Sequence, residues 1–282
     1  MTRKLLFILA FGMSFLSADG QDFSTYIKNN AVRTDKLDSS KKEVYNLLAD
    51  YKLIMIGEMH GTNEPAKFVV QLANLLTNNK DSVQIGLEIP SDLMTKYIAN
   101  QTDDNIYASD FFAKKSNDGR ASFAWAEIIS KLIKNSKVRI FFYDTNEGES
   151  KTSEDRDSLM YLKIKKEIKQ FPKWKTITLS GNIHNMILPY KNSAKMALYL
   201  IKDRELDISK KTCSLNHYYQ SGTMLNNIGN GIELREVNNS ASIYSQSVDF
   251  DSYLLLFPEI YKERYNGIYF TKTVSAAKMV GH

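Results

Sequence analysis

The chain alternates between short apolar runs and longer segments in which apolar residues recur every three or four positions. Four runs end at a glycine or a polar residue, as strands buried on both faces do; they span residues 53–56, 83–88, 138–143 and 176–179. After the first run, the helical period places apolar side chains at Phe68, Leu72, Leu75 and Leu76. Strands that alternate with helices predict right-handed crossovers and a mainly parallel sheet covered by helices on both faces.

Three further segments have weaker patterns. Residues 22–50 are predicted to be helical, and residues 154–170 form a charged helix after the third strand. The apolar run over residues 196–201 predicts a fifth strand. Short aromatic and β-branched runs over 213–219, 232–237 and 253–257 then predict antiparallel strands packed at the sheet edge, or loops over it.

The first twenty residues differ from the rest. Arg3 and Lys4 precede an apolar run from Leu5 to Leu16, and the small residues Ala18 and Gly20 follow. This order is typical of a secretory signal peptide and is too short for a spanning helix; a buried N-terminal helix is the alternative. We therefore expect a signal peptide at 1–20, export to the periplasm or medium, no transmembrane segment in the mature protein, and a single α/β domain over 21–282.

Composition narrows the possible partners. With 43% apolar and 24% charged residues, the 282-residue chain has the composition of a globular protein. Its 37 Lys and Arg against 32 Asp and Glu give a net charge of +5 without a basic stripe, so we expect no nucleic-acid partner. Cys213 is the sole cysteine, which excludes an intrachain disulfide.

Polar side chains follow the predicted strands at the ends where they stop. Glu58 and His60 follow the first strand and Glu88 ends the second. Asp144 ends the third strand, and Asn182 and His184 follow the fourth. Open parallel sheets bind ligands at the carboxyl ends of their strands, so we expect these side chains to converge.

This residue set suits three kinds of chemistry. Glu58, His60, Glu88 and His184 could ligate a divalent metal such as Zn, Mn or Fe. Alternatively, His60 could act as a general base oriented by a glutamate, with His184 as general acid. The same groups could also carry a metal or haem without turnover, and a purely structural role is the remaining alternative.

Other residues are candidates for substrate or haem binding, and the absence of three common motifs argues against several classes of enzyme. Arg156 is expected to clamp an anion or carbonyl, and Asp157 to partner a histidine; both could instead simply open a surface helix. Asp144 and Asn182 are expected to bind substrate as well. His217, beside two tyrosines, would suit haem iron or an aromatic edge strand. The sequence has no Gly-x-Ser-x-Gly elbow, no His-Glu-x-x-His helix and no phosphate-binding glycine pattern.

Four segments resemble one superfamily, which joins erythromycin esterase-like proteins, ChaN-type haem-uptake proteins and TraB/Tiki proteins. They are Gly57–Glu64, Gly86–Pro90, Arg156–Met160 and Ser180–His184. The resemblance implies an α/β fold whose site is lined by Glu58, His60, Glu88 and His184. The activities it implies are metal-free hydrolysis with a histidine base, metal-dependent peptidase chemistry, or haem binding.

From these patterns we expect an exported hydrolase that acts on an ester or amide bond of a small molecule or peptide. The ester or amide bond is implied by the resemblance alone. The alternative is a haem- or metal-binding uptake protein without turnover. One residue separates Glu58 from His60, as in the ChaN-like pattern, whereas the erythromycin esterases commonly have two. No cysteine follows the leader to carry a ChaN-type lipid anchor.

Overall fold

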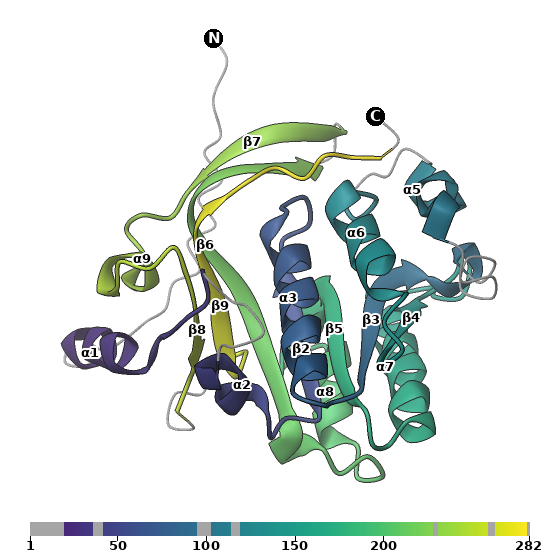
Figure 1. The fold of residues 1–282 in the computed structure, drawn as a ribbon, viewed down its shortest axis with the longest axis horizontal. Coiled ribbons are helices and arrows are strands. Elements are labelled where there is room, and N and C mark those ends of the chain that lie inside the picture. The colour runs from purple at the N-terminus through teal and green to yellow at the C-terminus, as the bar shows by residue number, and fades with distance from the viewer. Residues whose placement is uncertain are drawn as a thin grey trace.

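A computed structural model of the protein describes residues 20–35, 42–94, 103–113, 119–227, 231–258 and 263–280. Its centre is a nine-stranded sheet (Figure 1). The strands are β1 Val32–Arg33, β2 Leu53–Glu58, β3 Val83–Pro90, β4 Val138–Asp144, β5 Lys175–Gly181, β6 Thr212–Asn227, β7 Ile232–Asn238, β8 Ser252–Leu256 and β9 Gly267–Val274. Their order is β1-β8-β9-β6-β2-β5-β3-β4, and β7 pairs with β6 outside this path.

Helices cover both faces of the sheet. They are α1 Gly20–Asn30, α2 Lys42–Leu48, α3 Glu64–Asn78, α5 Asp110–Ala113, α6 Phe123–Leu132, α7 Ser153–Gln170, α8 Met196–Lys202 and α9 Ile243–Ser247. Along β2, Ile54 and Ile56 pack with α3 and α6. Leu53 and Met55 point the other way and pack with α7 and α8. Every residue of β2 is buried because successive side chains enter opposite hydrophobic layers.

The parallel sheet predicted from the apolar runs is confirmed. Strand β2 pairs in parallel with β5, and β3 pairs in parallel with both β4 and β5. The four predicted strands therefore end at one edge of the sheet. Helix α7 also lies where the charged helix was predicted.

The predicted fifth strand is wrong, because residues 196–201 form helix α8. A six-residue apolar run has the same appearance in a buried strand and in a buried helix. Two features favour the helix here. Met, Ala and Leu are strong helix formers, and the first backbone N–H of the segment, at Met196, donates to the Asp157 carboxylate at 3.0 Å.

The predicted helix over residues 22–50 is only partly correct. Helices α1 and α2 occupy its two ends, but β1 lies between them and pairs antiparallel with β8. Residues 36–41 lie outside the described residues. Of the predicted signal peptide, residues 1–19 lie outside them as well, and Gly20 begins α1. None of the described helices is long and apolar enough to cross a bilayer.

The C-terminal strands extend the sheet to one edge, as predicted, but one orientation differs. Strand β6 was expected to be antiparallel or a loop, yet it runs parallel to β2 and lies between β2 and β9. Its first residues, including Cys213 and Leu215, are fully buried, so it belongs to the sheet interior. Strands β7 and β8 are the antiparallel members of this half.

The segment after β9 ties the loop that follows β2 to helix α6. Ala277 N–H and Leu225 N–H both donate to the Gly61 carbonyl, at 2.8 and 3.0 Å. Gly61 has φ +98°, and a Cβ there would lie 1.7 Å from the Leu225 carbonyl oxygen, so this position requires glycine. Further along, Phe123 N–H donates to the Lys278 carbonyl at the start of α6. The loop that carries His60 is therefore held from two sides.

Candidate functional site

Glu58 and His60 form a hydrogen-bonded pair at the end of β2. The Glu58 side chain is buried, and its Oε1 lies 2.9 Å from His60 Nδ1. The same oxygen accepts a hydrogen bond from the indole Nε1 of Trp125, on α6, at 3.0 Å. Because Nδ1 of His60 faces Glu58, its other ring nitrogen, Nε2, is turned toward Glu88 and lies 3.8 Å from Oε2 of that residue.

Burial and the neighbouring carboxylates set the basicity of this pair. Burial raises the pKa of Glu58 above its ordinary range, while the hydrogen bonds from His60 and Trp125 oppose that rise. For His60, burial acts to lower the pKa, but the hydrogen bond to Glu58 and the charge of Glu88 outweigh it and raise the pKa. The His60 imidazole therefore takes up a proton more readily than an ordinary histidine.

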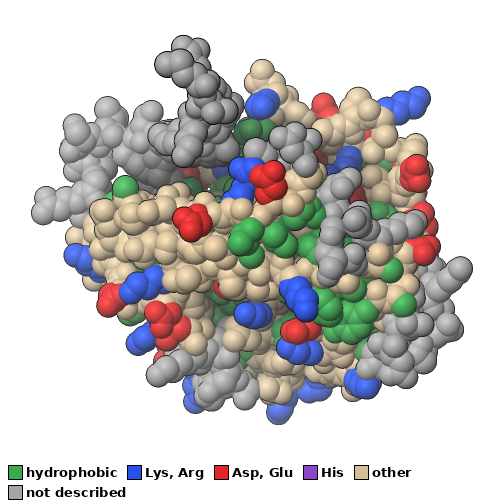
Figure 2. All heavy atoms as spheres, turned by 90° about the horizontal axis from the view of Figure 1, so that it is seen from above, with side chains coloured by type: hydrophobic (Ala, Val, Ile, Leu, Met, Phe, Trp, Pro, Cys, Tyr) green, Lys and Arg blue, Asp and Glu red, His purple; other side chains and the backbone are tan. Residues whose placement is uncertain are grey.

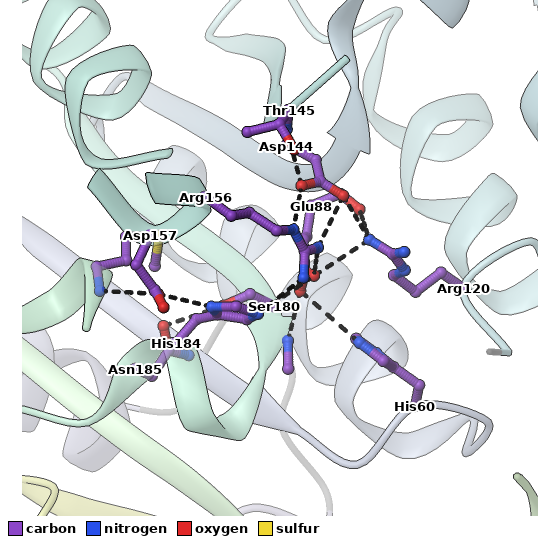
Figure 3. Close-up of polar contacts among 12 residues, drawn as sticks. His60, Glu88, Arg120, Asp144, Thr145, Arg156, Asp157, Ser180, His184 and Asn185 are labelled. Carbon is purple, nitrogen blue, oxygen red and sulfur yellow. Dashed lines mark hydrogen bonds and ion pairs between the residues drawn. The ribbon is translucent and has the colours of Figure 1, made fainter. Parts of the chain in front are cut away.

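Glu88 lies at the centre of the site, and the surrounding side chains point toward it (Figure 3). Its Oε1 accepts from Arg120 Nη1 at 3.1 Å and from Arg156 Nη2 at 2.5 Å. Its Oε2 accepts from the backbone N–H of Gly181 at 2.6 Å. Burial alone would raise the pKa of Glu88, but the two arginines and two nearby histidines lower it to about 2. Glu88 is therefore a permanent anion at neutral pH.

Asp144, at the end of β4, holds the same two arginines from the other side. Arg156 donates to it through Nε at 2.8 Å, and Arg120 donates through Nη1 at 2.7 Å. The two guanidinium groups hold the pKa of Asp144 well below its usual range, despite its burial. Asp144 therefore orients the arginines that bind Glu88.

His184 is held through both of its ring nitrogens. It lies in a short 3₁₀ turn, Asn182–Asn185, directly after β5. Its Nδ1 lies 2.7 Å from Oδ1 of Asp157, and its Nε2 lies 3.3 Å from Nη1 of Arg156. Because a guanidinium only donates, Nε2 accepts and Nδ1 carries the hydrogen. Asp157 is fully buried and also accepts a hydrogen bond from Lys195 Nζ at 3.2 Å.

The two histidines face a small cavity next to Glu88. His184 Nε2 lies 3.7 Å from Glu88 Oε1, on the opposite side from His60. Gly181 separates the rings, since a Cβ there would lie 3.2 Å from His60 Nε2 and 3.6 Å from His184 Cδ2. The cavity has a volume of about 220 Å³ and is lined by Glu58, Met59, His60, Gly181, Asn182, Ile183, His184 and Asn226.

Comparison with known proteins shows the fold. No protein-family model matches the chain, and no curated protein matches its sequence. A succinoglycan biosynthesis protein aligns with a TM-score of 0.71 and 10% identity over 94% of this chain and 100% of its own. A Bacillus cereus protein aligns with a TM-score of 0.68 and 12% identity over 92% and 99%.

A third solved structure is an erythromycin esterase mutant in its open conformation. It aligns with a TM-score of 0.56 and 12% identity, over 89% of this chain and 98% of its own. The chain therefore has an erythromycin esterase-like fold. This agrees with the fold that the sequence motifs implied, while the identities are too low to carry over an activity.

The structure brings together the side chains predicted at the strand ends. The cavity edge is surrounded by Glu58, His60, Glu88 and His184, and Asn182 lines it. Arg156 binds both Glu88 and Asp144. Asp157 partners a histidine, as one of the two interpretations of its segment expected. Sequence reasoning missed Arg120 and Lys195, because neither belongs to a recognisable motif.

The donor set does not fit a metal ion. Among the described residues, no group of three or more His, Cys, Asp or Glu side chains is arranged to hold one. Glu88, the central carboxylate, is already paired with two guanidinium groups, whose positive charge opposes a cation.

The described residues give little support to the haem-binding interpretation. His217 is buried, and its Nε2 lies 2.9 Å from the Thr271 hydroxyl, on β9. Burial lowers the pKa of His217 to about 3, and the Nε2 atom of this neutral ring is already engaged by Thr271. A cavity of about 220 Å³ lies below the 300–1,000 Å³ typical of ligand pockets. It is too small to enclose a haem.

Proposed function

We propose that this protein is a hydrolase that cleaves an ester or amide bond of a small molecule or peptide, with His60 as the general base. One observation carries the proposal: Glu58 binds His60 Nδ1, which leaves Nε2 facing the cavity 3.8 Å from the Glu88 carboxylate. A buried carboxylate that orients a histidine is the arrangement of a general base. The erythromycin esterase-like fold is consistent with hydrolysis. On the strength of its leader, we also propose that the protein acts after export.

The reaction begins with a water molecule that contacts both His60 Nε2 and Glu88 Oε2 from the cavity side. The two atoms lie 3.8 Å apart, too close for a water on the line between them, so the water lies beside that line and donates one hydrogen to each. His60 takes a proton from this water as its oxygen forms a bond with the carbonyl carbon. Glu58 stabilises the resulting imidazolium, because its carboxylate stays hydrogen-bonded to Nδ1.

The developing negative charge is stabilised on the other side of the cavity. Arg156 Nη1 uses one N–H to donate to His184 Nε2 at 3.3 Å, and its second N–H donates to the oxyanion at the edge of the cavity. When the tetrahedral intermediate collapses, the bond to the leaving oxygen or nitrogen breaks. The His60 imidazolium then returns its proton to that atom, which completes the hydrolysis and leaves His60 neutral again.

The test compares two histidine variants on a panel of nitrophenyl esters and anilides. His60→Gln is expected to reduce kcat about 10²- to 10⁴-fold, the usual contribution of a general base. His217→Gln is the matched control, because that buried histidine contacts Thr271 and is absent from the cavity lining. Both variants need unchanged circular dichroism. Equal turnover in wild type and His60→Gln would refute the proposal.

The carrier alternative is tested on the same samples. Titration with hemin, followed by absorbance, and elemental analysis of the purified protein report haem and metal binding directly. A Soret band or a stoichiometric metal that is lost in His60→Gln, together with no turnover of any substrate, would favour a carrier over a hydrolase.

A further inference from the structure

The positive charges nearest the cavity are already paired with carboxylates. Arg156 binds Glu88 and Asp144, Arg120 binds the same two residues, and Lys195 binds Asp157. Of the described residues that line the cavity, none is a lysine or an arginine. Because Glu88 and Asp144 already offset the two guanidinium charges, a substrate carboxylate or phosphate would find no cation in the cavity lining to balance its own charge.

Two apolar side chains also line the cavity. Met59 lies between Glu58 and His60, and Ile183 lies between Asn182 and His184. Ile183 is 39% exposed, although a large hydrophobic side chain is normally buried. The Tyr219 hydroxyl contacts Met59 Sδ at 3.6 Å, which fixes the thioether on its side of the cavity.

The remaining polar wall is uncharged. Asn182 and Asn226 line the cavity from the turn after β5 and from the end of β6. A side-chain amide offers both a donor and an acceptor, and it recognises a neutral carbonyl or amide without requiring a charge. On the face of the molecule seen from above, hydrophobic side chains also gather near the middle, among basic and acidic ones (Figure 2).

We propose that the cavity selects a neutral ester or amide with a short apolar group, and that Ile183 determines this specificity by packing against that group. This inference rests on the proposed function, since it names the substrate class of the same site. The small volume limits the group to a short chain. Ile183 immediately precedes His184, so the apolar contact and the reacting bond lie next to each other.

Binding is measured separately from turnover with two probes of nearly equal shape, butyramide and butyrate. Saturation-transfer NMR detects weak fragments, and the full-length protein is used. Wild type is expected to bind butyramide at least about tenfold more tightly than butyrate. Ile183→Ala is expected to weaken butyramide binding about five- to tenfold, because it removes most of the apolar contact. Leu162→Ala, at another exposed apolar residue on α7, is the matched control.

The outcomes separate this inference from the proposed function. Equal binding of the two probes, no binding of butyramide to wild type, or equal effects of Ile183→Ala and Leu162→Ala would each overturn the specificity role of Ile183. Failure of wild type to hydrolyse nitrophenyl butyrate while butyramide binds would instead overturn the proposed function. If both hold, Ile183→Ala lowers the ratio of kcat/KM for butyrate over acetate esters about tenfold.

Discussion

The Nδ1 nitrogen of His184 lies 2.7 Å from the carboxylate oxygen Oδ1 of Asp157, a residue 27 positions earlier on helix α7. Arg156, the residue before Asp157, approaches the opposite ring nitrogen at 3.3 Å. Consecutive residues of one helix turn therefore bind both nitrogens of the same imidazole. This arrangement fixes both the tautomer and the orientation of His184.

Asp157→Asn should disrupt this arrangement. An asparagine amide can donate to Nδ1 and so favour the opposite tautomer, which in a related carboxylate–histidine pair costs about 10⁴-fold in kcat. We expect a loss of at least about 10²-fold in kcat here, because Nε2 of the opposite tautomer carries the hydrogen, no longer accepts from Arg156 and so displaces the guanidinium that stabilises the oxyanion. The variant also leaves Lys195 buried without its carboxylate, so the free energy of unfolding should fall by about 3–5 kcal/mol. Turnover and urea unfolding measure the two effects.

Asp203→Asn is the matched control for this change. Asp203 also binds a lysine, Lys165 at 2.7 Å, and a tyrosine hydroxyl, but it directly follows α8 and does not line the cavity. The variant makes the same change in charge away from the cavity, so its turnover should equal that of wild type. If both variants lost the same activity, the effect of Asp157→Asn would reflect charge alone.

Trp125→Phe tests whether the indole positions the Glu58–His60 pair. The substitution removes the 3.0 Å hydrogen bond to Glu58 Oε1 and keeps the aromatic ring in the core. Since that hydrogen bond lowers the pKa of Glu58, its loss should raise that pKa further. A loss of about 1 kcal/mol in the transition state corresponds to about fivefold in kcat.

The second tryptophan supplies the control for that measurement. Trp174 contacts Lys52 through its backbone carbonyl, so Trp174→Phe preserves this contact and leaves the site untouched. Its turnover should not change. A Trp125→Phe variant as active as Trp174→Phe would show that Glu58 needs no support from the indole.

The site could be predicted from the sequence wherever its residues end a strand. Glu58, Glu88 and Asp144 each follow an apolar run, and parallel strands bring such ends to one edge of the sheet. Arg120 has no such signal. It lies before α6, in a segment without periodicity, and only the folded sheet brings it within 2.7 Å of Asp144.

The errors in the fold have a common physical cause. The run at 196–201 is continuously apolar and contains no period that distinguishes helix from strand, and the mixed polar and apolar residues of the first half of β6 do not indicate the direction of that strand. Contacts distant in sequence decide these cases. Asp157 accepts the Met196 N–H at the start of α8, and β2 fixes the direction of β6 through parallel pairing.

The pH profile should show that His60 acts in its neutral form. A general base works only when unprotonated, so kcat/KM should rise with pH through the pKa of His60. Because Glu58 and Glu88 raise that pKa, the inflection should lie above the ordinary value of 6.5. Glu58→Gln removes one of these charges and should shift the inflection to lower pH. A wild-type inflection at or below 6.5 would contradict this account of His60.

Stability should depend on Glu88 in the acid range. The pKa of Glu88 is lowered from 4.5 to about 2, so its folded carboxylate binds protons less readily than the unfolded one. The stabilisation is therefore complete above pH 4.5 and is lost as pH falls toward 2. We expect the difference in free energy of unfolding between wild type and Glu88→Gln to shrink over that interval. A difference that is constant from pH 6 to pH 3 would show that Glu88 keeps an ordinary pKa.

Gly181→Ala should separate catalysis from folding. Gly181 has φ −54°, which alanine adopts without strain, and its backbone N–H would still donate to Glu88. The new methyl group would lie 3.2 Å from His60 Nε2 and 3.6 Å from His184 Cδ2. It would therefore occupy the space in which the attacking water must lie. We expect the free energy of unfolding to change by less than about 1 kcal/mol.

Turnover in the same variant should fall about 10²-fold, as expected when a reacting group is displaced by about 1 Å. The acid-range stability profile provides the internal control, because an intact contact between Gly181 N–H and Glu88 should keep that profile unchanged. If Gly181→Ala kept wild-type turnover with an unchanged profile, the reaction could not take place between the two histidines, and the general base would have to act from another side of His60.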